Sequence, residues 1–281
     1  MKIAAIALTG LLLGINAPYY HSPQNTKRPN LHKNHLQKRY EKGYSSDDFF
    51  KLKIKVGEKQ GNVFSRTISY KSADFPEIVR RVGGTGIYTV LNNDPSAPIF
   101  DGIFRYDGRP ESRSKVEINN MGKTVSYDGK SATNTDASGV LYNSFIWGIP
   151  PAKIHAGDSW KVVIPQAWEL GGAGSQTVTV VDIDDLNHTI RLKREGRSDG
   201  FYDNDVKQLD VTKDGKAIKM DITPGLSHWT GYTTFKNGFV VSDELMVTRP
   251  IKLISEGLSF SADQREYILL NEMPVDATAA M

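Results

Sequence analysis

The sequence predicts an all-β protein whose strands form one large, curved antiparallel meander, as in a half-barrel, a β-clam or an incomplete barrel, with few short helices. Apolar and polar residues alternate over many segments, which is typical of strands with one buried and one solvated face. Asp214-Gly215 and Asn237-Gly238 separate pairs of such segments and favour tight hairpin turns. No long amphipathic helix interrupts the pattern, so the strands have to twist and curl to bury their apolar faces.

The expected strands run through most of the chain. In the first half they cover residues 49–56, 62–72, 86–91, 98–108, 114–122 and 123–130. In the second half they cover residues 159–165, 175–184, 188–196, 207–223, 228–248 and 265–270, of which 207–223 and 228–248 are each a hairpin. The segment SADFPEIVRRVGG, residues 72–84, is the one expected short helix, because Gly83 and Gly84 are a natural stop.

The segment IPPAKIHAGDSW, residues 149–160, marks the entrance to the second half of the sheet. Its two prolines cannot donate to a β ladder, so the preceding segment VLYNSFIWGI, residues 140–149, is expected to be a strand that ends there. Asp158 is expected to hydrogen-bond its own turn, and Trp160 is expected to pack into the core at the start of the next strand. An acid–base pair of Asp158 with His155 is the alternative interpretation.

The segment has a proline, then Gly157-Asp158 and Trp160, before a long β meander. This pattern resembles one in exported bacterial β-rich proteins of unknown function that have LolA-like, lipoprotein-carrier-like half-barrels. The segment TGYTTFKNGFVVSDELMV is similar to a strand, turn and return strand near the end of such sheets. The resemblance covers residues 140–255 and implies a concave sheet that holds an apolar ligand or a partner. It supplies no catalytic residues, and this chain lacks the lipidated cysteine of the lipoprotein members.

The chain begins with the order of features found in secretory signals. Lys2 precedes an uncharged apolar run, and residues 15–17 resemble a small-residue cleavage site, so residues 1–17 are expected to be a signal peptide. The run is too short for a helix that spans a bilayer. There is no cysteine, which excludes disulfides, thiol nucleophiles and thiolate metal sites. We therefore expect an exported protein, periplasmic or extracellular.

Residues 18–45 are expected to be a flexible basic arm before a β-rich globular domain of residues 46–281. The arm carries six lysines and arginines and one acid. A solvated tether is the expected role, and contact with an anionic surface is the alternative interpretation. From residue 46 onward 28 lysines and arginines oppose 31 acids, so nucleic-acid binding is not expected. The domain is expected as one unit or as two sub-sheets that meet near residues 140–157.

No pattern in the sequence predicts a catalytic residue, a metal site or a cofactor. Asp203 and Asp205 lack the glycine and glutamate positions of a calcium loop. The acidic stretch 182–185 before His188 is expected to be a turn between two strands rather than a general acid–base group. The chain has no Gly-x-Ser-x-Gly motif, and its glycine-rich segments lack the strand–glycine–helix context of a phosphate loop.

Trp168 and Trp229 are the candidate ligand-binding residues, because both are expected in loops that line an open end of the sheet. We expect a non-enzymatic envelope or secreted protein that binds a lipid-like ligand or an envelope protein on its concave apolar face. One alternative is a carbohydrate-binding or adhesion module in which these tryptophans stack on sugar rings. The other is a hydrolase of envelope polymer, which would need a histidine to meet a carboxylate across the fold.

Overall fold

The computed structural model describes residues 42–94, 96–119, 124–131, 140–165, 171–199 and 207–275. Its two helices are short, and nearly all other elements are strands. The elements are β1 (Tyr44–Ser45), α2 (Asp47–Phe50), β2 (Lys59–Lys71), β3 (Ile78–Asn92), β4 (Ile99–Tyr106), β5 (Ser112–Ile118), β6 (Thr124–Tyr127), β7 (Lys130–Ser131), α3 (Ser144–Trp147), β8 (Lys153–Ile154), β9 (Ser159–Ile164), β10 (Gly174–Asp184), β11 (Thr189–Ser198), β12 (Gln208–Lys213), β13 (Lys216–Pro224), β14 (Ser227–Lys236), β15 (Phe239–Ser255) and β16 (Leu258–Met273).

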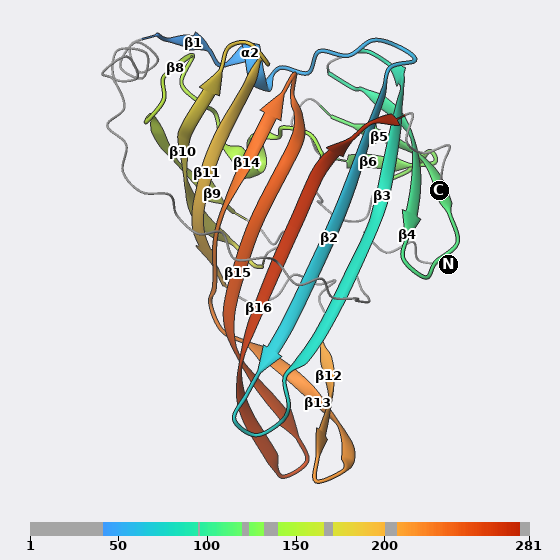
Figure 1. Cartoon of the computed structure of the whole chain (residues 1–281), viewed down its shortest axis with the longest axis vertical. Coiled ribbons are helices and arrows are strands. Elements are labelled where there is room, and N and C mark those ends of the chain that lie inside the picture. The colour runs from blue at the N-terminus through green and yellow to red at the C-terminus, as the bar shows by residue number, and fades with distance from the viewer. Residues whose placement is uncertain are drawn as a thin grey trace, which may run out of the picture.

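Fourteen strands form one curved antiparallel sheet that is not closed into a barrel (Figure 1). The main path across it is β7-β6-β5-β4-β3-β2-β16-β15-β14-β11-β10-β9. β13 pairs with the lower part of β15, beside the part that pairs with β14, and β12 pairs with β13. The expected all-β class and the large curved antiparallel arrangement are therefore confirmed.

The two ends of this sheet are built differently. At the upper end in Figure 1, α2 and the segment after it cross over the strands. At the lower end, the β12–β13 hairpin lies beside the ends of the long strands. Leu209 and Met220 of this hairpin are fully buried in one cluster with Leu253 of β15 and Phe260 of β16. The lower end thus has its own hydrophobic core, and we call the upper end the open end.

The turn dipeptides act as the sequence predicts. Asp214-Gly215 joins β12 to β13, and Asn237-Gly238 joins β14 to β15. All four residues have positive φ angles, between 50° and 81°. This is the conformation that a two-residue hairpin of type I′ requires at both central positions.

Three local predictions are wrong. Residues 140–149 form no strand, because they contain α3 and pair with the sheet only through a single bridge of Leu141 to Phe239. Residues 49–56 form no strand: α2 ends at Phe50, and an extended segment without a ladder follows. Residues 72–84 form no helix, because the chain enters β3 at Ile78. Gly84 sits inside that strand opposite Phe64 of β2, and a β-carbon there would lie 2.8 Å from the Phe64 ring. The glycine therefore makes room for a cross-strand aromatic ring and does not end a helix.

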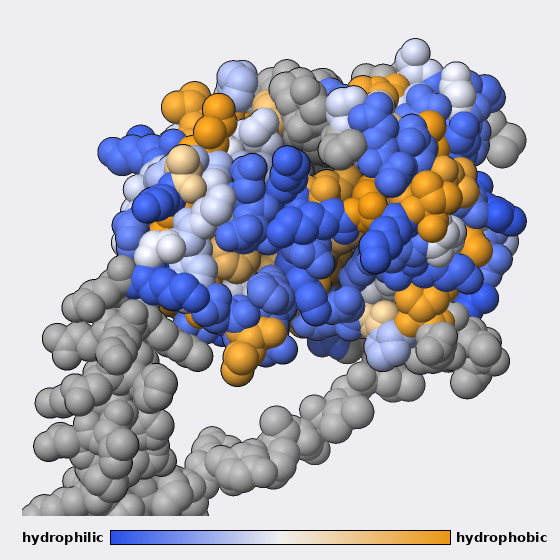
Figure 2. Space-filling model, turned by 90° about the horizontal axis from the view of Figure 1, so that it is seen from above, coloured by the Kyte–Doolittle hydropathy of each residue, from blue (hydrophilic) through white to orange (hydrophobic). Residues whose placement is uncertain are grey.

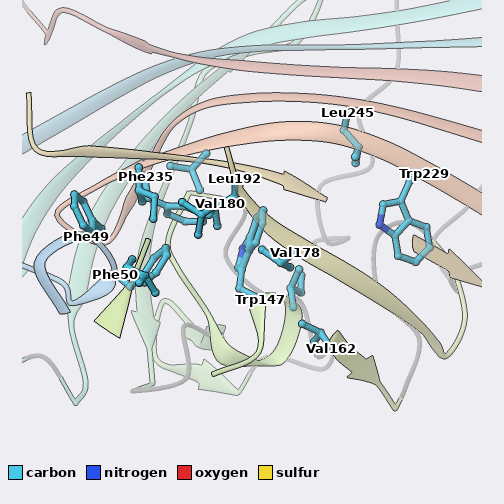
Figure 3. Close-up of a cluster of buried hydrophobic side chains, with 14 of the residues drawn as sticks. Phe49, Phe50, Trp147, Val162, Val178, Val180, Leu192, Trp229, Phe235 and Leu245 are labelled. Carbon is cyan, nitrogen blue, oxygen red and sulfur yellow. The ribbon is translucent and has the colours of Figure 1, made fainter. Parts of the chain in front are cut away.

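Three clusters of buried side chains line the concave side of the sheet. The largest lies at the open end and combines both helices with β9, β10, β11, β14 and β15 (Figure 3). A second joins Val90, Phe100, Val116 and Phe239 with the chain around residue 140, and the third is the cluster at the lower end. Alternation along β14 and through most of β16 places every second residue on the buried side of the sheet.

The N-terminal part of the described chain joins the fold earlier than expected. Tyr44 and Ser45, assigned to the arm from the sequence, form β1 and pair with β8. Residues 1–41, with the expected signal peptide and the rest of the arm, lie outside the described residues. Within the described ranges, no helix has the length and apolar character needed to cross a membrane.

Candidate functional site

A cavity of about 390 Å³ opens at the open end of the sheet. Its wall is mixed, with apolar surface only slightly exceeding polar surface. It is lined by Ser46, Asp47, Phe50, Lys51, Leu52, Pro98, Ile118, Asn119, Leu141, Tyr142, Ile149, Pro150 and Gly238. Seen from this end, hydrophobic side chains gather in a hollow between hydrophilic lobes (Figure 2). Small-molecule sites are commonly concave clefts of about 300–1,000 Å³, and this cavity lies near the lower limit of that range.

One wall of the cavity is the extended segment of residues 51–58, which we call the strap. Leu52 and Ile54 on the strap are half-buried and pack against the second cluster, whereas the lysines between them are exposed. The backbone N–H of Lys53 donates to the Asn237 carbonyl over 3.2 Å, and that of Gly57 donates to the Val90 carbonyl over 2.9 Å. The strap is thereby tied to the β14–β15 turn at one end and to β3 at the other.

Gly238 makes the crossing of the strap over the turn possible. Its N–H donates to the Phe49 carbonyl over 2.7 Å, and its φ angle is 81°. A β-carbon at this position would lie 2.8 Å from the Leu52 Cα. The Asn-Gly dipeptide therefore sets the hairpin and also lets the strap lie directly on it.

The inner wall is the segment of residues 140–150, which we call the plug and which contains α3. Asn143 caps this helix by accepting from the Ile146 N–H over 2.8 Å. The Trp147 ring stands between the strands near Val178 and Leu192 (Figure 3). Its centroid is 4.9 Å from that of Phe235, edge to face. The plug fills this part of the concave face, so the concave face is not an open groove here.

Side chains of the sheet bind the last carbonyls of α3. Gln176 on β10 donates to the Ile146 carbonyl, and Trp160 on β9 donates to the Trp147 carbonyl over 2.7 Å. Gln176 also accepts from the indole N–H of Trp229 over 3.0 Å. A four-residue helix makes too few internal bonds to be stable alone, and these contacts fix its position on the sheet.

The cavity wall holds one strongly perturbed ionisable group, Tyr142. Burial raises the pKa of its phenol, and the hydroxyl donates to the Gly148 carbonyl. It is therefore a neutral donor that ties the two ends of the plug together. Lys51 and Asp47 lie exposed at the rim. The arrangement suits an apolar ligand with a polar end at the rim, and the described residues of the wall include no nucleophile–base pair.

Of the two tryptophans singled out in the sequence, the structure describes only Trp229, and this residue offers no surface for sugar stacking. Trp229 lies within β14, not in a loop, and is only 3% exposed. Its ring packs over Gly196 on β11, where a β-carbon would lie 2.3 Å from the indole. Burial removes the exposed ring face that stacking on sugars requires. Trp168 lies outside the described residues.

His155 and Asp158 do contact each other, but within one turn. Oδ2 of Asp158 accepts from the His155 backbone N–H over 2.8 Å and lies 3.2 Å from Nδ1 of the His155 ring. Trp160 follows as the first inward residue of β9 and is half-buried against the largest cluster. The turn role expected for Asp158 is confirmed, and the carboxylate that His155 meets comes from its own loop.

The other acidic stretches form no site within the described residues. Asp184 closes the β10–β11 turn by accepting from the backbone N–H groups of Leu186 and Asn187. Asp203 and Asp205 lie outside the described residues. Over the described ranges, no group of three or more histidines and acids could hold a metal ion.

Buried charges on the concave face are the feature that the sequence analysis missed. Arg194 on β11 donates to Asp243 on β15 over 2.7 Å, and Arg66 on β2 pairs with Glu266 on β16. Burial raises the pKa of the Asp243 carboxyl, and the positive charge of Arg194 opposes that rise. Arg249 is only 2% exposed. The alternation of inward and outward residues could have indicated their burial, because these charged residues share the inward side of their strands with apolar residues.

Comparison of the chain with protein-family models and with curated proteins finds no match. The site therefore has to be interpreted from its own residues. The similarity to LolA-like half-barrels stays a prediction.

Proposed function

We propose that this protein is a non-enzymatic binding protein that takes an apolar, lipid-like ligand into the cavity at the open end of its sheet. The observation that carries the proposal is the cavity itself, about 390 Å³ in volume, between the strap and the plug. Phe50, Leu52, Ile118 and Leu141 give it an apolar wall, and burial of apolar surface is the main driving force for binding at such a site.

The place of action proposed for the protein is the cell envelope or the exterior. Support comes from the signal-like leader of residues 1–17 and from the absence of cysteine. A carrier of apolar ligands fits this setting, because such molecules need a protein to cover them in water.

The test is binding of N-phenyl-1-naphthylamine, an apolar dye that becomes fluorescent when it leaves water. Ile149 lines the cavity but is 85% exposed, so Ile149→Asp should leave the fold intact. It removes an apolar contact worth about 1 kcal/mol and adds a charge to the mouth, and we expect about tenfold weaker dye binding.

The matched control is Leu186→Asp, at another exposed apolar residue, 89% exposed, in the β10–β11 turn. It should bind the dye as the unmodified protein does. No saturable dye binding, or equal losses in the two variants, would refute a ligand site at this cavity.

A further inference from the structure

Positive charge is concentrated in one part of the chain. Residues 18–59 hold ten lysines and arginines against four acids, whereas residues 60–281 hold 24 against 28. The described part of residues 18–59 begins next to β8, with which β1 pairs. It then crosses the open end as α2 and the strap (Figure 1). The described part of the basic stretch therefore lies at the end where the cavity opens.

Three lysines of the strap face solvent together. Lys51, Lys53 and Lys55 are exposed, while the residues between them, Leu52 and Ile54, turn toward the protein. Successive side chains of an extended segment point in opposite directions, so the three ammonium groups share the outer side of the strap. Lys51 also lines the cavity rim.

Most acids of this end are already engaged. Asp185 pairs with Lys42, and Asp158 contacts His155. Asp48 is 4.0 Å from Lys53.

Glu58 accepts from the Lys55 backbone N–H over 3.0 Å, and Asp47 is the acid on the cavity rim itself. Among carboxylates of the described residues, none comes within ion-pair distance of Lys51 or Lys55. Their charges are available to an anionic partner.

Apolar side chains stand beside these lysines. Ile149 on the cavity rim is 85% exposed, and Val56 at the end of the strap is 63% exposed. A soluble polyanion would engage the lysines alone. An anionic lipid surface would engage both, because phosphates attract the ammonium groups while the apolar side chains enter the interface.

We propose that the open end docks on anionic lipid membranes through Lys51, Lys53 and Lys55, with Ile149 at the contact, so that the cavity mouth faces the bilayer. This inference rests on the proposed function, because docking in this orientation would give an apolar ligand a path that avoids water. The basic arm, for which contact with an anionic surface is the alternative interpretation, precedes this end in the sequence, and its positive charge would add to the attraction.

The experiment is co-sedimentation of the whole protein with vesicles of phosphatidylglycerol and phosphatidylcholine, and with vesicles of phosphatidylcholine alone. We expect binding to the anionic vesicles that weakens as salt is raised. Each lysine near such a surface contributes roughly fivefold. The triple variant K51E/K53E/K55E should therefore bind at least about a hundredfold more weakly.

The matched control is K216E/K219E/K252E, which reverses three exposed lysines at the lower end. It should bind the vesicles as the unmodified protein does. Equal losses in the two triple variants, or undiminished binding of the strap variant, would overturn the proposal. So would binding of dextran sulfate that depends on the strap lysines without binding to vesicles, because that result identifies a soluble polyanion as the partner.

A label tests the orientation directly. The chain has no cysteine, so Ile149→Cys gives a single site for an environment-sensitive dye. Its emission should shift to the blue on anionic vesicles. The same dye at Ile254→Cys, at the lower end of β15 and 44% exposed, should not shift. A shift at Ile254 and none at Ile149 would contradict the orientation.

Failure of docking is distinguishable from failure of the cavity. K53E/K55E reverses only strap lysines that do not line the cavity, so it should still bind N-phenyl-1-naphthylamine in solution while it binds anionic vesicles more weakly. Vesicle binding without dye binding would leave the docking surface standing and refute the ligand site. Dye binding without vesicle binding would do the reverse.

Discussion

Gln176 should be one of the most sensitive polar residues of the protein, and Gln176→Leu tests why. Its side chain is 3% exposed, donates to the Ile146 carbonyl of the plug and accepts from the Trp229 indole. Leucine of similar size removes both of these hydrogen bonds. Each buried group that loses its hydrogen bond lowers the free energy of unfolding by about 1–3 kcal/mol. Leucine has no amide to desolvate on folding, and this offsets about 1–2 kcal/mol of the loss. The net expected loss is about 2–3 kcal/mol.

The assay is urea unfolding followed by tryptophan fluorescence and by circular dichroism. With a slope of about 2–3 kcal/mol per M, the midpoint should fall by about 1 M. The control is Gln208→Leu on β12, where an exposed glutamine donates to Asp221 over 2.7 Å. Its loss should stay within about 0.5 kcal/mol, as at most surface positions.

A double-mutant cycle separates the two buried bonds of Gln176. Trp229→Phe removes the indole N–H, so Gln176→Leu should cost about 1–2 kcal/mol less in that background than in the unmodified protein. If Gln176→Leu costs no more than Gln208→Leu, then the plug is not held to the sheet by this amide. The reasoning about the inner cavity wall would then be refuted.

Two further results are expected. Gly238→Ala should lower the free energy of unfolding by about 2–4 kcal/mol and weaken dye binding, because the new β-carbon meets the backbone of Leu52. Gly215→Ala is also at positive φ but has open space around it, so it should lower the free energy of unfolding by only about 1 kcal/mol. Equal losses in both would show that the strap does not rest on the turn. Burial raises the pKa of Tyr106 to about 12, so Tyr106→Phe should remove an ionisation near pH 12 from the ultraviolet titration. The raised pKa stabilises the fold fully below pH of about 10, and this contribution is lost as the pH rises through about 12; an unchanged titration curve would contradict that burial.

The fold class followed from local signals that the structure preserves. Alternation and the Asp-Gly and Asn-Gly dipeptides encode strand faces and tight turns within a few residues of each other, so both could be recognised without knowing the partners. The local predictions failed at positions where contacts with residues distant in the sequence determine the structure. Residues 49–56 alternate like a strand, yet the strap bonds only to residues such as Asn237 and Val90 at scattered points, and no continuous neighbour builds a ladder.

The candidate site was predictable only in part. An apolar site on a curved sheet was expected, but its walls come from the strap, the plug and strand ends that are far apart in the sequence. The misplacement of Trp229 has the same cause. Its burial depends on Gly196, which lies opposite it on β11 and supplies the space for the indole. No local pattern around Trp229 encodes that partner.

The plug and the strap already cover part of the concave face, and this limits where a ligand could enter the cavity. Displacing the plug would expose Trp147, which is 4% exposed, and would leave the side chains of Gln176 and Trp160 without their carbonyl partners. Lifting the strap breaks backbone bonds that contribute about 1 kcal/mol each and uncovers only half-buried side chains. Local opening follows the path of lower cost, so we expect the strap rather than the plug to move if a ligand enters. A ligand that enters beside the strap passes Lys51 at the rim before it reaches the apolar wall, and this order matches the proposed approach to an anionic lipid surface.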